Sequence, residues 1–113
     1  MLLANKNEVT ATNITETTAV CSGEVTSDAG YTVTERGFCW SSTGPPTTSS
    51  SKLIVAGTTG PFSGTITGLT LNTMYYLRAY AINSQGTGFS SQITFYSAFN
   101  LNLNLNAWYL FRV

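Results

Sequence analysis

The chain has 113 residues, enough for one domain whose two-layer core needs neither metal nor disulfide support. Only 9% of the residues are charged, the formal net charge is zero, and the five lysines and arginines are scattered along the sequence. A nucleic-acid-binding surface needs a basic stripe, and a membrane span needs about 20 consecutive apolar residues, so both classes are excluded.

Short stretches of alternating apolar and polar residues, separated by turn residues, predict strands and no helix longer than a turn. A polar run at 42–51 that contains Gly44-Pro45-Pro46 is predicted to be a loop, because proline donates no ladder hydrogen bond. Turn signals recur every 8 to 12 residues or so, which is typical of an antiparallel sandwich. The predicted strands are 7–14, 18–25, 33–42, 52–56, 62–67, 73–83 and 89–97.

Two of these strands predict how the core is filled. The second strand carries small residues on one face, which implies a bulky partner opposite them. Phe38 and Trp40 lie on one side of the third strand and are the candidates for that partner. The small residues are Ala19, Cys21, Gly23 and Val25.

The stretch 68–83 reads as a corner followed by a central strand with two unlike faces. One face is smooth and apolar, and it consists of Tyr75, Leu77, Ala79 and Ala81. The other is aromatic with one charge, and it consists of Tyr76, Arg78, Tyr80 and Ile82.

The spacing Leu69-x-x-x-Thr73-x-Tyr75 resembles the corner of fibronectin type III domains. Over about residues 7–97, the chain is also similar to a Thr/Ser-rich variant of this domain that is found in bacterial surface and secreted multidomain proteins. This similarity is carried by the segments 13–21, Gly23-Glu24-Val25-Thr26-Ser27-Asp28, Glu35-Arg36-Gly37-Phe38-Cys39-Trp40-Ser41, and 75–83. The chain departs from the animal domains at Gly23, which takes the place of the second-strand Trp.

The resemblance implies an all-β, seven-stranded antiparallel β-sandwich at residues 1–98, in which the Tyr75 hydroxyl bonds back to the preceding backbone. It also implies a spacer or protein-interaction module, secreted or at the cell surface, whose partners are neighbouring domains of a longer chain. Residues 1–4 are too short for a signal peptide, so the export signal is expected upstream of this sequence. A family fold by itself implies no activity.

Catalytic and metal chemistry find few candidates. The chain has no histidine and two cysteines, which removes Ser-His-Asp and Cys-His catalysis and a structural zinc site. No pair among its five acidic residues has the spacing of a glycosidase dyad or an EF-hand loop, although Glu24 and Asp28 flank one turn. We therefore expect a protein that is not an enzyme and has no cofactor.

Cys21 and Cys39 allow two interpretations. In a sandwich the second and third strands usually lie in opposite sheets, so two inward thiols could form a disulfide worth about 3 kcal/mol. If Phe38 and Trp40 point inward, however, Cys39 points outward. Two free thiols that behave as small apolar side chains are the other interpretation.

The face formed by Tyr76, Arg78 and Tyr80 also allows two interpretations. An exposed aromatic patch beside a guanidinium is suited to polysaccharide or peptide binding, which would make the chain a carbohydrate-binding accessory module. Alternatively, Arg78 stacks on neighbouring tyrosines and covers them, which completes an ordinary sheet face.

Residues 99–113 follow the last predicted strand and form a separate C-terminal extension. The alternation of apolar residues with asparagine predicts an added strand that pairs with an edge of its own sheet or of a second copy. A tail without structure is the alternative. The apolar positions are Phe99, Leu101, Leu103 and Leu105.

Overall fold

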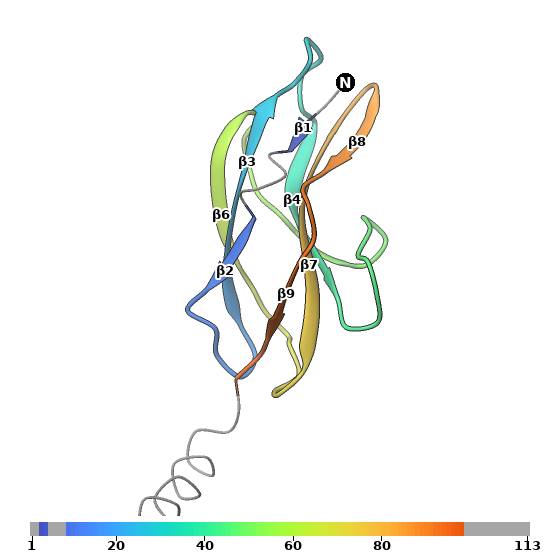
Figure 1. The fold of residues 1–113 in the computed structure, drawn as a ribbon. Coiled ribbons are helices and arrows are strands. Elements are labelled where there is room, and N and C mark those ends of the chain that lie inside the picture. The colour runs from blue at the N-terminus through green and yellow to red at the C-terminus, as the bar shows by residue number, and fades with distance from the viewer. Residues whose placement is uncertain (1–2, 5–8, 99–113) are drawn as a thin grey trace, which may run out of the picture.

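Two antiparallel β-sheets pack face to face in the computed structural model, which describes residues 3–4 and 9–98 (Figure 1). Every regular element within these residues is a strand. The strands are β1 (Leu3–Ala4), β2 (Thr10–Thr12), β3 (Ala19–Ser27), β4 (Glu35–Ser41), β5 (Ser51–Ile54), β6 (Gly60–Ile66), β7 (Met74–Asn83), β8 (Gly86–Phe89) and β9 (Ile93–Tyr96).

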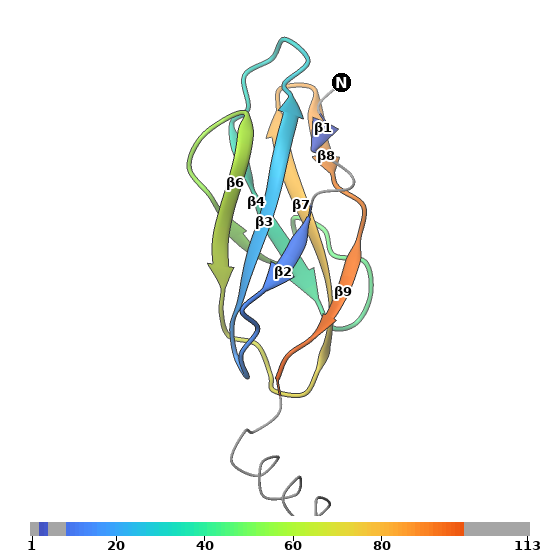
Figure 2. The ribbon, with the colours of Figure 1, turned by 60° about the vertical axis from the view of Figure 1, so that its left-hand side comes forward.

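Strand β3 is the centre of the first sheet. Strand β6 pairs along one side of it, from Ala19 to Val25. On the other side β2 pairs with residues 20–22 of β3, and β1 pairs with Val25 and Ser27 (Figure 2). Together β1 and β2 therefore occupy one position in the sheet, at the two ends of β3.

Strand β7 is the centre of the second sheet, as the stretch 68–83 predicted. Strand β4 pairs along one side of it and carries β5 at its outer edge. On the other side β9 pairs with residues 74–77 of β7, and β8 pairs with residues 80–83. The sandwich thus has seven strand positions, two of which are divided into shorter strands.

The division at the last position corrects the predicted continuous strand 89–97. Ser90 replaces part of the ladder: its N–H donates to the Ala79 carbonyl, and its hydroxyl accepts from the Ala79 N–H at 2.9 Å. The connection between the predicted strands 73–83 and 89–97 is also shorter than predicted, because β8 begins at Gly86, which pairs with Asn83. The hairpin loop is residues 84–85, and the Gln85 N–H donates to the Asn83 side chain.

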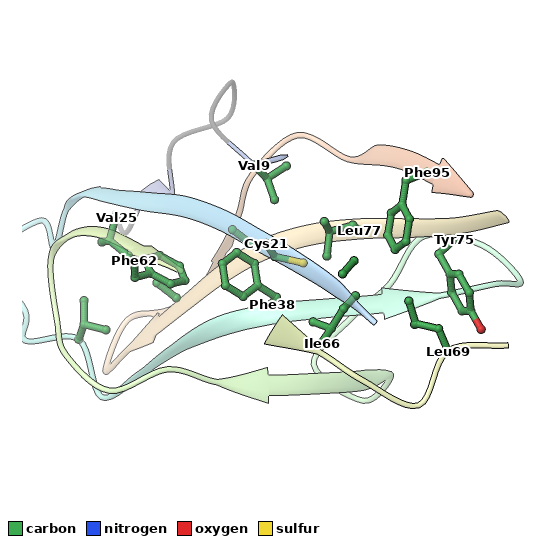
Figure 3. Close-up of a cluster of buried hydrophobic side chains, with 14 residues drawn as sticks. Val9, Cys21, Val25, Phe38, Phe62, Ile66, Leu69, Tyr75, Leu77 and Phe95 are labelled. Atoms are coloured by element: carbon green, nitrogen blue, oxygen red, sulfur yellow. The ribbon is translucent and has the colours of Figure 1, made fainter. Parts of the chain in front are cut away.

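The core lies between the two sheets and draws on both (Figure 3). The inward face of β7 is buried as predicted, with Leu77, Ala79 and Ala81 fully enclosed. Phe38 is also fully buried and lies 5.0 Å, centre to centre, from the Phe62 ring. Trp40 is half-buried and packs against this cluster from outside. Phe38 is therefore the main bulky partner of the β3 face that carries the small residues.

At Gly23 the two sheets approach each other closely. A Cβ atom added there would lie 3.0 Å from the Ala79 Cβ and 3.4 Å from the Phe38 ring. Such contacts are tighter than packed side chains normally make. Gly23 therefore makes room chiefly for Ala79 of the opposite sheet, with the Phe38 ring beside it.

Candidate functional site

The corner before β7 is held by a tyrosine hydroxyl. Tyr75 accepts a hydrogen bond of 2.8 Å from the backbone N–H of Thr70, five residues upstream. The Tyr75 ring stacks on Phe95 of β9 at 5.8 Å, and Leu69 is buried beside them in the core. The connection between β6 and β7 is thereby attached to the sheet that it enters.

The outer face of β7 is covered rather than open. Tyr80 is fully buried, and Tyr76 and Arg78 are half-buried. Of the two interpretations of Tyr76, Arg78 and Tyr80, an exposed aromatic patch does not hold at Tyr80, whose side chain is fully buried. The reason is that neighbouring groups cover this face: Lys52 of β5 lies over the Tyr80 ring, Phe89 of β8 stacks on Arg78, and the 42–50 loop is bonded to Arg78.

A carboxylate on β4, that of Glu35, binds both Tyr80 and Lys52. Glu35 Oε2 accepts a hydrogen bond of 2.7 Å from the Tyr80 hydroxyl and forms a 2.8 Å ion pair with Lys52 Nζ. These hydrogen bonds, that from Lys52 first, hold the pKa of Glu35 below its usual range. Burial and the hydrogen bond to Glu35 raise the pKa of Tyr80, so its hydroxyl stays protonated at neutral pH.

Arg78 fastens the 42–50 loop over the same face. Its Nη1 donates to the Pro46 carbonyl at 3.2 Å, and its guanidinium carbon lies 4.9 Å from the centre of the Phe89 ring. Pro46 is among the fully buried side chains. The stacking partner of Arg78 is thus Phe89 of the neighbouring strand, not a tyrosine of its own strand.

Cys21 and Cys39 are free and buried. Cys21 lies on the inner face of the first sheet, and Cys39 lies on the outer face of the second. Cys21 belongs to the core, whereas Cys39 pairs in register with Lys52 and Arg78 on the outer face. Burial raises the pKa of Cys21 to about 12 and that of Cys39 to about 11. Both are thiols rather than thiolates at neutral pH and are poor nucleophiles.

Arg36, for which the sequence predicts no role, organises a loop. Its Nε and Nη2 donate to the Ala56 carbonyl, and its Nη1 donates to the carbonyls of Thr58 and Thr59. The guanidinium also lies 4.7 Å from the centre of the Phe62 ring. An arginine at an inward-facing position of β4 was the available signal, since a buried guanidinium needs several acceptors.

Sequence reasoning also missed a polar pocket of about 300 Å³ beside the corner, here called the Trp40 pocket. It lies where β4 ends, β5 begins and the β6–β7 connection passes, and a Trp-Ser-Ser sequence facing a Ser-Ser sequence was its signal. The lining residues are Trp40, Ser41, Ser42, Ser50, Ser51, Gly68 and Tyr75.

The acidic side chains form no metal centre in the described part of the chain, where no group of three or more Asp, Glu, Cys or His side chains comes together. Asp28 instead accepts the Gly30 N–H at 2.9 Å and shapes the turn between β3 and β4. The predicted assembly residues Phe99, Leu101, Leu103 and Leu105 lie outside the described residues.

Comparison with known proteins gives structural matches only. A scan against protein-family models found no match, and a search of curated protein sequences found none either. Among solved structures, the FN1–FN3 domains of chicken CNTN1 match with a TM-score of 0.64 and 18% identity, over 82% of this chain and 31% of that one. A fibronectin type III domain of human KIAA0970 matches with a TM-score of 0.58 and 15% identity, over 88% of this chain and 74% of that one.

The chain folds as a fibronectin type III-like domain. A third structure similar to this fibronectin type III-like domain is the sensor domain of the anti-sigma factor RsgI4 from Pseudobacteroides cellulosolvens. The TM-score is 0.57 and the identity 21%, over 86% of this chain and 94% of that one. In the described ranges of the domain, no helix has the length and apolar character needed to cross a bilayer.

Proposed function

We propose that this fibronectin type III-like domain is a non-catalytic spacer or protein-interaction module of an exported, multidomain bacterial protein. The fold supports this role, because its structural neighbours include one domain's length of a three-domain segment of CNTN1. The RsgI4 neighbour is by its name a sensor domain, which supports recognition rather than chemistry as the role.

The observation that carries the proposal is the placement of the two ends of the described chain. Leu3 pairs with Ser27, at the last residue of β3. Ala98 donates its N–H to the carbonyl of Thr15, in the turn that precedes β3 (Figure 1). The chain therefore enters at one end of the sandwich and leaves at the other, about 30 Å away for nine residues of strand.

This end-to-end path is suited to a module that holds its neighbours apart. A domain whose ends lay side by side would bring its neighbours together instead. The polar side chains of the outer face support the non-catalytic part of the proposal, because Glu35, Lys52 and Tyr80 are bonded to one another. None of the three is left free to act on a substrate.

The test is small-angle X-ray scattering on one, two and three copies of the chain joined in tandem. We expect the maximum particle dimension to grow in nearly equal steps, by roughly the length of one sandwich for each copy. A control chain joins the same copies through long Gly/Ser linkers, which behave as flexible random coils, so its scattering should show a broad distribution of particle lengths in place of equal steps. A compact particle whose length does not increase with copy number would contradict the spacer role.

A further inference from the structure

The lining of the Trp40 pocket has a distinctive chemistry. It combines two aromatic side chains, Trp40 and Tyr75, with four serines and one glycine, and no Asp, Glu, Lys or Arg lines it. A charged ligand would lose hydration there without gaining a counter-charge. A neutral ligand rich in hydroxyl groups would find both a flat apolar surface and hydrogen-bonding partners.

Two of the serines are held in place by the loop itself. The Ser41 hydroxyl accepts the Thr43 N–H at 3.1 Å and lies 3.0 Å from the Thr43 hydroxyl. The Ser50 hydroxyl accepts the Thr47 N–H at 3.0 Å. These bonds set the shape of the pocket before any ligand arrives, which reduces the entropy lost on binding.

The other polar groups are available to a ligand. The side chains of Ser42 and Ser51 are exposed, and neither hydroxyl bonds to another described residue. The indole N–H of Trp40, which is half-buried, also bonds to no described residue. The Tyr75 hydroxyl accepts from Thr70 and still has its own proton to donate.

We propose that the Trp40 pocket binds a neutral sugar ring, with Ser42 and Ser51 as hydrogen-bonding residues. The volume of about 300 Å³ is at the lower end for small-molecule sites, so it suits one ring or the end of an oligosaccharide. None of Tyr76, Arg78 and Tyr80 lines this pocket. It adds a ligand to the proposed module and does not depend on the spacer role.

The experiment is an NMR titration of the ¹⁵N-labelled full chain with glucose, N-acetylglucosamine, cellotriose and maltotriose at millimolar concentrations. The indole signal of Trp40 is assigned with a Trp108→Phe variant, since the chain has two tryptophans. We expect saturable shifts of the Trp40 indole N–H and of the backbone N–H groups of Ser42, Ser51 and Gly68. Inorganic phosphate and acetate are expected to leave these signals unchanged.

A double variant, Ser42→Ala with Ser51→Ala, tests the two serines. Both are exposed, so the fold is expected to survive, and dispersed amide signals check this. We expect binding to weaken about tenfold, the effect of losing two modest hydrogen bonds. Ser63→Ala with Ser91→Ala is the matched control, because both serines are exposed and lie outside the pocket.

Three results would overturn the proposal. The first is that none of the four saccharides shifts the Trp40 indole signal in a saturable way. The second is that the double variant binds as tightly as the unchanged chain. The third is that phosphate or acetate binds as tightly as the sugars, which would show that the uncharged lining does not select a neutral ligand. None of these results would bear on the spacer role, which rests on the positions of the chain ends.

Discussion

The Tyr80 hydroxyl donates a hydrogen bond of 2.7 Å to Glu35 Oε2, across two paired strands of the second sheet. Lys52 of β5 binds the same oxygen, so this carboxylate links β4, β5 and β7. The tyrosine ring is fully buried while the carboxylate remains partly in solvent. The network therefore gives the hydroxyl of a buried tyrosine a hydrogen-bond acceptor on the outer face of the sheet.

Tyr80→Phe is expected to lower the free energy of unfolding by about 1 kcal/mol at pH 7. Because the pKa of Glu35 is lowered on folding, its contribution is present above the unfolded value of about 4.3 and disappears as the pH falls through the folded value. Tyr80→Phe removes one of the hydrogen bonds that lower this pKa, so the loss of stability between pH 7 and pH 3 should become smaller. Urea denaturation at both pH values measures this.

Tyr76→Phe is the matched control for that experiment, because Tyr76 lies on the same face and its hydroxyl bonds to no described residue. Its effect should stay within about 0.5 kcal/mol at both pH values. Equal stability of Tyr80→Phe and the unchanged chain across this range would mean that the hydrogen bond from Tyr80 to Glu35 contributes nothing.

The two thiols are expected to be unreactive in the folded chain. Because burial raises the pKa of both Cys21 and Cys39, 5,5′-dithiobis(2-nitrobenzoic acid) should react slowly with the native chain at pH 8 and rapidly in urea. A reducing agent should leave the thermal midpoint unchanged. Finding no titratable thiol in urea, together with a lower midpoint on reduction, would show instead that a disulfide forms.

Tyr75→Phe removes the hydroxyl that accepts the Thr70 N–H while keeping the ring against Phe95. We expect the free energy of unfolding to fall by about 1 to 2 kcal/mol, because a part-buried donor loses its partner. Chemical denaturation gives the value, and hydrogen exchange of the Thr70 amide should accelerate. An unchanged exchange rate at Thr70 would show that the corner does not depend on this bond.

Gly57→Ala is expected to be more destabilising than Gly60→Ala in the same turn. Both glycines have positive φ, +115° and +94°, so both variants strain the backbone by about 1 kcal/mol or more. Only at Gly57 would the new Cβ collide with the Arg36 guanidinium, which must then leave its carbonyl partners. Thermal denaturation should show a difference of about 1 to 2 kcal/mol, and equal midpoints would mean that Arg36 moves aside without cost.

Deletion of residues 99–113 tests the predicted assembly strand. If this segment pairs with a sheet edge, removing it should reduce the mass measured by light scattering or lower the thermal midpoint. A second variant replaces Leu101 and Leu103 with asparagine and keeps the chain length. It should reproduce the effect of the deletion if these apolar side chains cause the pairing. A truncated chain that equals the full chain in both mass and midpoint would show that the segment has no such role.

The core could be predicted from sequence, whereas the outer face of the second sheet could not. Period-two alternation decides which side of a strand a residue takes, so the inward positions of Cys21, Phe38 and Leu77 followed directly. Alternation does not say what covers the other side. Pro46 does so here, from a loop more than 30 residues away from Arg78 along the chain.

The divided last strand and the role of Arg36 had similar causes. At Ser90 a side-chain oxygen takes over a ladder position, an alternative that any serine offers and that alternation does not record. Arg36 occupies an inward position of β4, but its long side chain turns back to carbonyl groups of the 56–59 segment. The Trp40 pocket, likewise, depends on three segments meeting at one end of the sandwich.

The internal hydrogen bonds of the cationic side chains also affect how ionic strength would change binding to this domain. Among residues 9–98 the cationic side chains are Arg36, Lys52 and Arg78, and each is occupied by carbonyl groups or by Glu35. The described surface thus offers hydroxyl groups in place of free cations, and ionic screening acts mainly on free, solvent-exposed charges. An acidic partner would find no free cation on the described surface, so raising the ionic strength should change its binding little.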